Sequence, residues 1–253
     1  GSVATLGAVS VHFMNVRPAV QFASSHGFDQ ACDQKFSEWQ DIPACRSDEL
    51  PRMAIWGDSY AMHYVPGLAD APIIQMTRSA CAPIHGVANV GGEYTRSWAQ
   101  GCADFNRSVV NALASMPSVE IVLISSPFAQ VLKDSGQSLL VDGEVSPWSP
   151  VGAARLSATL QELKAAGKRP ILIAPTPPAG FDAGVCNERL VENRLSLGRN
   201  GCDIDRAEAA RRSASVIELL HQAAAMAGAE VLDPATVLCG EAICRTREGA
   251  SVL

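Results

Sequence analysis

Apolar residues follow two alternating patterns along the 253-residue chain. Short continuous apolar runs are typical of buried strands, whereas longer stretches with apolar residues three and four positions apart are typical of helices. The runs predict strands at residues 52–56, 72–77, 119–125, 171–174 and 230–232. The spaced stretches predict helices at residues 60–69, 102–115 and 150–166, and a long helix that begins after Asp203 or Asp205 and ends near Gly228.

This alternation predicts an α/β fold, because strands joined by helical crossovers are parallel and carry helices on both faces of their sheet. We expect a three-layer α/β/α sandwich with a parallel, flavodoxin-like sheet of about five strands. The pair Asp142-Gly143 between short apolar runs predicts an inserted hairpin over residues 137–145. Residues 1–50 show little periodicity, so we expect an irregular lead-in packed on a main domain of residues 51–253.

Composition and charge exclude several classes of protein. With 47% hydrophobic and 18% charged residues, the chain can bury a sizeable core and is not disordered for most of its length. The net charge of -6 leaves no basic stripe for a phosphate backbone, so we expect no nucleic acid partner. The apolar runs are far shorter than the roughly 20 residues of a membrane-spanning helix.

Eight cysteines fall in neighbouring pairs separated by loops. Proximity favours four local disulfides, although eight cysteines allow 105 connectivities. A structural zinc site is the alternative, but no C-x-x-C spacing is present. Disulfides would indicate an oxidising compartment. The expected pairs are Cys32 with Cys45, Cys81 with Cys102, Cys186 with Cys202, and Cys239 with Cys244.

The amino terminus shows no recognisable export signal. Gly1-Ser2 resembles a cloning remnant, and residues 3–11 are too weakly apolar for an export segment. We therefore expect the mature protein to have been exported by a segment that this sequence lacks.

The segment Gly57-Asp58-Ser59 lies where the first strand turns into the first helix. Glycine permits a tight turn there, and free N–H groups of the first helical turn point toward any oxyanion that forms. Asp58 is expected to fix the turn by hydrogen bonds to the backbone. Ser59 is therefore the candidate nucleophile. The segment is not the G-x-S-x-G elbow of α/β-hydrolases, because Ala61 stands at the last glycine position.

The sequence resembles the SGNH (GDSL-like) family, in particular the periplasmic SGNH domain fused to integral-membrane acyltransferase-3 proteins, which O-acetylate bacterial surface glycans. Besides Gly57-Asp58-Ser59, the resemblance rests on Ser79–Ile84 after the second strand, on Cys102–Asn106, and on Asp233-Pro234 leading to the last two cysteines. It extends loosely over residues 50–253.

One departure from the family concerns the general base. Family members carry a D-x-x-H element shortly after the position of Cys244, and its histidine takes the proton of the serine. The sequence ends at Leu253 without that element, so we expect the complete protein to continue with it. Within the sequence, His63, four residues after Ser59, and His85 are weaker substitutes.

The resemblance also implies an oxyanion hole. The second-block glycine of the family corresponds to the turn at residues 78–80, so Ser79 or Ala80 is expected to supply an N–H group. The family's G-x-N-D is replaced by residues 125–128, which leaves a Ser126 hydroxyl as a candidate donor; simple capping of the strand end is the equal alternative for Ser126. The weaker candidates for binding a sugar are Arg78, Trp98 and Trp148, with Tyr94 beside them.

The resemblance implies a periplasmic O-acyltransferase domain in which Ser59 accepts an acetyl group and passes it to a glycan hydroxyl. The acyl donor would come from a membrane acyltransferase-3 module on the amino-terminal side, which would tether the domain to the inner membrane. An acetyl esterase using the same serine is one alternative, and a non-catalytic glycan-binding or scaffold domain is another. No metal or nucleotide cofactor is expected, since no metal-ligand cluster or phosphate loop is present.

Overall fold

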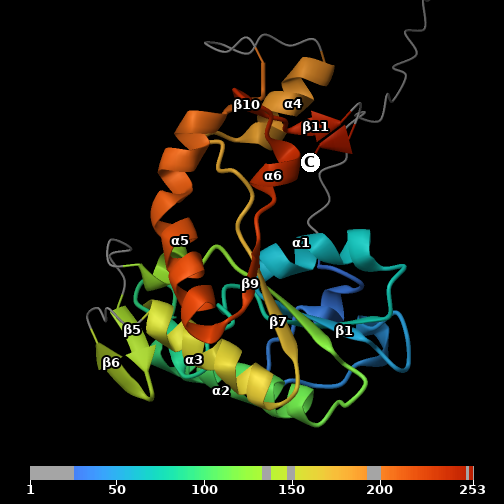
Figure 1. The fold of residues 1–253 in the computed structure, drawn as a ribbon, viewed down its shortest axis with the longest axis vertical. Helices are drawn as coiled ribbons and strands as arrows, with labels where there is room; N and C mark the ends of the chain where they lie inside the picture. The colour runs from blue at the N-terminus through green and yellow to red at the C-terminus, as the bar shows by residue number, and fades with distance from the viewer. Residues whose placement is uncertain (1–25, 133–137, 147–151, 193–200, 249–250, 253) are drawn as a thin grey trace, which may run out of the picture.

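The computed structural model describes residues 26–132, 138–146, 152–192, 201–248 and 251–252. A five-stranded parallel sheet forms its centre (Figure 1). The two strands nearest the expected nucleophile are buried along nearly their whole length, because helices or loops cover both faces. The strands are β1 (Met53–Gly57), β2 (Ile73–Thr77), β4 (Ile121–Ser125), β7 (Arg169–Ile173) and β9 (Glu230–Leu232).

The strand order is β2-β1-β4-β7-β9. The chain leaves β1 to one side to form β2 and then crosses over to form β4 on the other side of β1. Doubly wound sheets bind ligands at such a switch, beyond the carboxyl ends of the strands. Here the switch lies between β1 and β4, whose last paired residues are Gly57 and Ser125. The predicted α/β fold with about five parallel strands is confirmed.

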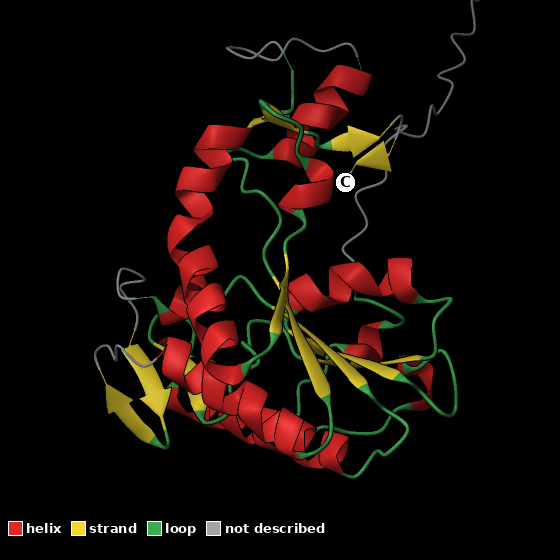
Figure 2. Ribbon diagram, in the orientation of Figure 1, coloured by secondary structure: helices red, strands yellow, loops and turns green. Residues whose placement is uncertain are grey.

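Helices cover both faces of this sheet (Figure 2). On one face, Ala61 and Val65 of α1 pack against Ile55 and Ile73 of the sheet. On the other face α2 and α3 enclose a larger core around Trp56, and α5 packs against α3. The helices are α1 (Ser59–Leu68), α2 (Arg96–Ala114), α3 (Gly152–Ala165), α4 (Ala183–Val191), α5 (Arg206–Ala227) and α6 (Ala235–Leu238), with three 3-10 turns, η1 (Gln30–Cys32), η2 (Pro43–Cys45) and η3 (Ala129–Val131).

Smaller sheets flank the central one. The expected hairpin forms around Asp142 and Gly143, both with positive φ. The strand β3 (Val87–Val90), from the loop between β2 and α2, pairs with it to make a three-stranded sheet. A separate small core around Ile204 and Ala209 lies at the amino-terminal end of α5. These elements are β3 (Val87–Val90), β5 (Ser138–Val141) and β6 (Glu144–Ser146), then β8 (Ile204–Asp205) with β10 (Ile243–Cys244), and β11 (Arg247–Glu248) with β12 (Ser251–Val252).

Residues 26–50 lie along the outer edge of β2. The N–H of Gln34 donates to the carbonyl of Thr77 at 3.0 Å, and the N–H of Ser47 donates to the carbonyl of Ile73 at 3.0 Å. These bonds satisfy backbone groups of β2 that would otherwise remain open at an edge strand. This part of the lead-in is therefore continuous with the sheet.

Several helix boundaries differ from the sequence-based expectations. Helix α2 begins at Arg96, earlier than expected, because the Thr95 hydroxyl accepts a hydrogen bond from the N–H of Trp98 and caps it. Helix α4 lies in a segment for which the sequence analysis predicted no helix. Of the two expected caps for α5, Asp205 is the one used, and the helix ends at Gly228 in the left-handed conformation.

The eight cysteines form four disulfides, which are the pairs that proximity suggested: Cys32–Cys45, Cys81–Cys102, Cys186–Cys202 and Cys239–Cys244. Among the helices in the described ranges, none has both the length and the apolar character needed to cross a bilayer.

Candidate active site

Ser59 is the first residue of α1 and follows directly on the carboxyl end of β1. It is exposed, and no other described residue hydrogen-bonds its hydroxyl. As the first helical residue, it also has an N–H group without a partner inside the helix. A hydroxyl and a free N–H thus meet at the positive end of a helix, which favours negative charge.

Gly57 makes this placement possible. A Cβ atom at this position would lie 1.9 Å from the carbonyl oxygen of Ser125 and 2.9 Å from the Cβ of Ala61. Only glycine lets the end of β1 approach β4 and α1 this closely. The sequence expectation of a tight turn therefore has a steric basis in the packing of β1 against β4.

Asp58 caps α1 and joins it to β4. Its Oδ1 accepts a hydrogen bond from the N–H of Tyr60 at 3.0 Å, and its Oδ2 accepts one from the hydroxyl of Ser126 at 2.6 Å. Burial raises the pKa of Asp58 to about 6, although the hydrogen bonds from Ser126 and Tyr60 act in the opposite direction. Asp58 thus fixes the helix start, as expected from the sequence.

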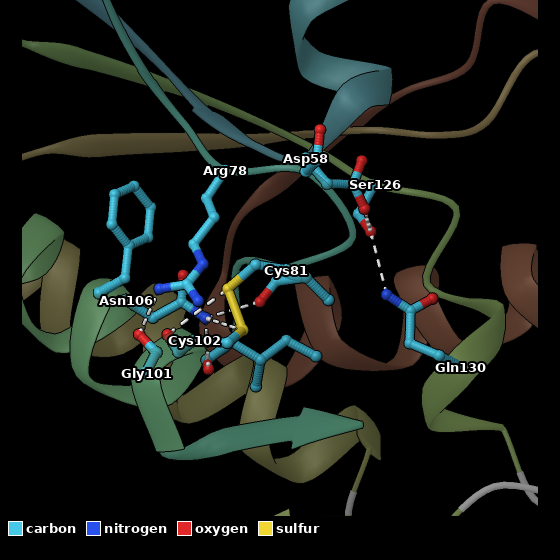
Figure 3. Close-up of a disulfide and its surroundings, with 12 residues drawn as sticks. Asp58, Arg78, Cys81, Gly101, Cys102, Asn106, Ser126 and Gln130 are labelled. Carbon is cyan, nitrogen blue, oxygen red and sulfur yellow. Dashed lines mark hydrogen bonds between the residues drawn. A yellow bond between two sulfur atoms is a disulfide. The ribbon is translucent and has the colours of Figure 1, made fainter. Parts of the chain in front are cut away.

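Ser126 is fully buried and engaged with its neighbours, so the suggestion that its hydroxyl stabilises an oxyanion is corrected. Its proton is donated to Asp58, and its oxygen accepts a bond from the side-chain amide of Gln130 at 3.3 Å (Figure 3). The hydroxyl therefore orders the end of β4, which is closer to the capping alternative.

The turn after β2 carries the second group of candidates. The N–H of Ser79 donates to Oδ1 of Asp33, and its hydroxyl donates to Oδ2, both at 2.8 Å. The Ser79 N–H is therefore not free for an oxyanion, which corrects one of the two expected donors. Ala80 has φ +60°, and its N–H donates to no other described residue. Ala80 is the donor that this turn leaves available.

The same turn is fastened to α2 (Figure 3). The Cys81–Cys102 disulfide joins the two segments covalently. The buried amide of Asn106 donates to the carbonyl of Ala82 at 2.7 Å and accepts from the indole N–H of Trp56 at 3.2 Å. These contacts hold the turn in one position relative to β1.

Arg78 is buried and its guanidinium is engaged by two backbone carbonyls, so its expected role in substrate binding is corrected. Its guanidinium donates to the carbonyls of Phe36 and Gly101, both at 2.7 Å. The residue as a whole is 6% exposed. It also lies 5.7 Å from the ring centroid of Trp98. Arg78 therefore joins the lead-in to α2 beneath the turn, and burial lowers its pKa.

A pocket of about 540 Å³ opens at Ser59. Two residues that the sequence expectations did not place at the site, Asn89 and Gln130, contribute polar side chains to it. Asn89 lies on β3, is 7% exposed, and none of the described residues hydrogen-bonds its amide. The only sequence signal was an asparagine within a short apolar run. The pocket is lined by Asp58, Ser59, Ser79, Ala80, Asn89, Tyr94, Pro127, Ala129 and Gln130.

The aromatic candidates are placed differently from one another. Tyr94 lines the pocket, and Trp98 packs against Tyr94 with ring centroids 4.5 Å apart and ring planes tilted by 43°. Trp98 is not among the residues that line the pocket, so it supports Tyr94. Trp148 lies outside the described residues.

The histidines of the described part of the chain do not line this pocket. His63 is exposed on α1, and His85 pairs with Glu162 of α3 at 2.5 Å. His26 lies 3.9 Å from Asp33 on the lead-in. Within the described ranges there is also no group of three or more residues that could hold a metal ion.

The sequence matches the family described as "SGNH domain (fused to AT3 domains)" over residues 31–253. The chain belongs to the SGNH family. The resemblance drawn from Gly57-Asp58-Ser59 is thereby confirmed. The SGNH match also begins inside the lead-in, at residue 31, which agrees with the hydrogen bonds between this segment and β2. The comparison with curated proteins finds no match.

Membership in the SGNH family places the chain among esterase- and acyltransferase-type enzymes. The family description also names the AT3 domains to which such SGNH domains are fused. Ser59, Ala80 and Asn89 are the parts of the pocket that fit chemistry on an acyl group.

Proposed function

We propose that this SGNH domain transfers an acetyl group to a bacterial cell-surface glycan through Ser59. The observation that carries the proposal is the exposed Ser59 hydroxyl at the first turn of α1, inside a pocket shared with Ala80 and Asn89. A serine at a free helix start is a suitable nucleophile because positive partial charge faces the reacting oxygen.

The first step forms an acyl-enzyme. The Ser59 oxygen bonds to the carbonyl carbon of the acyl donor while its proton passes to a general base. The carbon–oxygen double bond opens to an oxyanion, which then collapses and releases the donor's leaving group with that proton. In the second step the oxygen of a glycan hydroxyl bonds to the carbonyl carbon of the Ser59 ester while the base takes the hydroxyl proton. The bond between this carbon and the Ser59 oxygen breaks, so the sugar keeps the acetyl group and Ser59 receives that proton.

Three donors support the oxyanion in this proposal: the N–H of Ser59, the N–H of Ala80 and the side-chain amide of Asn89. All three residues line the same pocket, and none of these donors is used by another described residue. The family's G-x-N-D element is replaced by residues 125–128 in this chain, and in this proposal Asn89 supplies the side-chain amide for the oxyanion instead. Each such donor contributes a factor of about 10²–10³ to the rate in serine enzymes.

The general base is part of the proposal as well. The family resemblance implies a histidine from a D-x-x-H element, which would take the Ser59 proton. Neither His63 nor His85 lies in the pocket of the described structure, so we do not assign the role to them.

The acceptor and the compartment follow from other features. Tyr94 offers an aromatic face and Gln130 a polar side chain to a sugar at the rim of the pocket. Four disulfides favour an oxidising compartment, which for a bacterial surface glycan is the periplasm. The fusion in the family description supports an acyl donor delivered by a membrane acyltransferase module.

The test compares the full-length protein with its Ser59→Ala variant in hydrolysis of p-nitrophenyl acetate. We expect the variant to lose activity by at least a hundredfold with its thermal midpoint unchanged, since Ser59 is exposed. Equal rates would favour the non-catalytic binding domain. Mass-spectrometric detection of an acetylated oligosaccharide then separates transferase from esterase, which would release only acetate.

A further inference from the structure

One side chain of the lead-in, Asp33, hydrogen-bonds a residue of the pocket wall, Ser79. Its carboxylate accepts two hydrogen bonds of 2.8 Å from Ser79, one from the N–H and one from the hydroxyl. Asp33 is 7% exposed, while Ser79 lines the pocket next to Ala80. A carboxylate 46 residues upstream therefore fixes the turn that borders the nucleophile.

Two bonds to one carboxylate fix the orientation of Ser79 more tightly than one bond would. Ala80 follows in a left-handed conformation, φ +60°, which a residue with a Cβ adopts only when its surroundings hold it there. Because the Ser79 N–H is directed to Asp33, the next N–H along the chain, that of Ala80, is the one left open. The geometry of the oxyanion donor thus depends on Asp33.

Asp33 is itself held firmly at the end of β2. Its backbone forms an isolated parallel β-bridge with Thr77. The hydroxyl of Thr77 donates to the carbonyl of Cys32 at 2.8 Å. The Cys32–Cys45 disulfide closes this part of the lead-in. Burial raises the pKa of Asp33, but hydrogen bonds from Lys35 and Ser79 outweigh it and lower the pKa below its ordinary value. The carboxylate is therefore ionised at neutral pH.

We propose that Asp33 is a positioning residue of the acyl-transfer site, which orients the Ser79–Ala80 turn so that the Ala80 N–H meets the charge that develops on the acyl oxygen. This inference rests on the proposed function of Ser59. It extends the active site into the lead-in, since Asp33 acts on the reaction through the turn without touching the acyl group.

The experiment measures p-nitrophenyl acetate hydrolysis by the full-length protein and two Asp→Asn variants. Asp33→Asn keeps the size of the side chain but replaces one acceptor by a donor. We expect kcat to fall about ten- to a hundredfold, while KM stays within about twofold. This decrease does not exceed the fall in kcat of about 10²–10³ that removal of a whole oxyanion donor causes. Asp29→Asn is the matched control: it is exposed in the same segment, caps η1, and leaves kcat unchanged.

A second variant tests the same contact from the other side. Ser79→Ala removes the hydroxyl-to-carboxylate bond but keeps the N–H bond, so we expect a smaller loss of kcat, about three- to tenfold. Because both changes act on one contact, the double variant Asp33→Asn/Ser79→Ala falls no further than Asp33→Asn alone. If Asp33 had a purely structural role, its replacement would lower the thermal midpoint without a fall in kcat at nearly constant KM.

The outcomes separate this inference from the proposed function. If Ser59→Ala is inactive but Asp33→Asn has the kcat of Asp29→Asn, Asp33 has no positioning role and the Ser59 chemistry stands. If Asp33→Asn fails to fold, a wild-type kcat of Ser79→Ala overturns the inference. If Ser59→Ala retains the full rate, the proposed function fails; an unchanged amide chemical shift of Ala80 in Asp33→Asn would then overturn the positioning as well.

Discussion

The Asp58 carboxylate accepts a 2.6 Å hydrogen bond from the hydroxyl of Ser126, 68 residues later in the chain. The bond joins the start of the helix that carries Ser59 to the end of β4. Both residues are buried, Asp58 at 2% and Ser126 at 0% exposure. The nucleophile is therefore held at the point where the strand order of the sheet switches, by a group whose charge depends on pH.

Asp58 makes the stability of the fold depend on pH. Its pKa in the folded protein is about 6, above the ordinary value of 3.8. Between about pH 4 and pH 6 the folded state therefore binds more protons at Asp58 than the unfolded state does. The free energy of unfolding consequently decreases as pH rises through this window, by at most about 3 kcal/mol from this one group.

Asp58→Asn tests this dependence. The amide stays neutral at every pH and its oxygen can still cap the helix, so we expect the decrease in the free energy of unfolding between about pH 4 and pH 6 to vanish in the variant. Urea unfolding of both proteins at steps of half a pH unit, from pH 4 to pH 8, measures the free energy of unfolding as a function of pH. The pKa of Asp33 is shifted the other way, so its effect lies below about pH 4, outside the window. Parallel curves for the two proteins would contradict the assignment to Asp58.

Gly57→Ala is expected to destabilise the protein by about 3 kcal/mol or more, because the new Cβ would lie 1.9 Å from a backbone oxygen that cannot move aside alone. In a protein of this size that lowers the thermal midpoint by about 6–12 °C. Gly67→Ala is the control, since it lies in α1 with nothing within 4 Å of its added Cβ. It should be neutral or slightly stabilising. Similar midpoints for both variants would refute the steric role of Gly57.

Local patterns predicted the central sheet well. Continuous apolar runs and their glycine and proline boundaries gave all five strands, and Gly228 marked the end of α5, because these signals act within a few residues. The turn with Gly57 and Ser59 was equally visible, since a strand, a glycine and a helix start follow one another directly in the sequence.

Contacts between distant segments were not predictable in the same way. The sequence shows a serine at position 79 but not that Asp33 takes its N–H, nor that Arg78 turns inward to Phe36. Asn89 was missed because β3 is a short strand whose partner, β5, lies about fifty residues later in the chain. Side-chain roles of this kind depend on which segments the fold brings together.

Arg78→Lys tests the structural role assigned to Arg78. The guanidinium donates through Nη1 to two carbonyls from different segments and lies 5.7 Å from the ring centroid of Trp98, and the shorter lysine with its compact ammonium does not reproduce this reach and planar contact. We expect a loss of about 2–3 kcal/mol in the free energy of unfolding, since hydrogen bonds to charged groups are worth about 1.5–3 kcal/mol each. The KM for p-nitrophenyl acetate and for the glycan acceptor should remain within about twofold. A selective rise in the acceptor KM with unchanged stability would restore Arg78 as a substrate contact.

Removing one or the other of two disulfides that close loops of similar length tests whether the lead-in affects activity independently of its effect on stability. Cys32 and Cys45 are 13 residues apart and Cys186 and Cys202 are 16 apart, so replacing either pair by serine should cost about 3 kcal/mol. Only the first pair adjoins Asp33, so only its loss should lower kcat, by several fold, in the temperature range where both variants are folded. Alkylation of thiols before and after reduction verifies that the other disulfides are intact. Equal kcat in both variants would show that the lead-in does not influence the pocket.

Asn89 and Gln130 both present an amide to the pocket, but they differ in what the amide already does. That of Gln130 donates to Ser126 at 3.3 Å, whereas that of Asn89 donates to no other described residue. If Asn89 supplies an oxyanion donor, Asn89→Ala should lower kcat for p-nitrophenyl acetate by about 10²–10³ with little change in KM. Asn89→Asp should be worse still, because its charge would repel the oxyanion.

The control for Asn89 is Asn111→Ala, an exposed asparagine on α2 whose loss should leave kcat unchanged. Rates for Asn89→Ala equal to those of this control, with Ser59→Ala inactive, would show that the oxyanion relies on backbone N–H groups alone. The turn at Ala80 and the start of α1 would then carry the whole stabilisation. In that case the loss of kcat in Asp33→Asn should lie at the upper end of its range, because no side-chain amide would remain to compensate for a displaced Ala80 N–H.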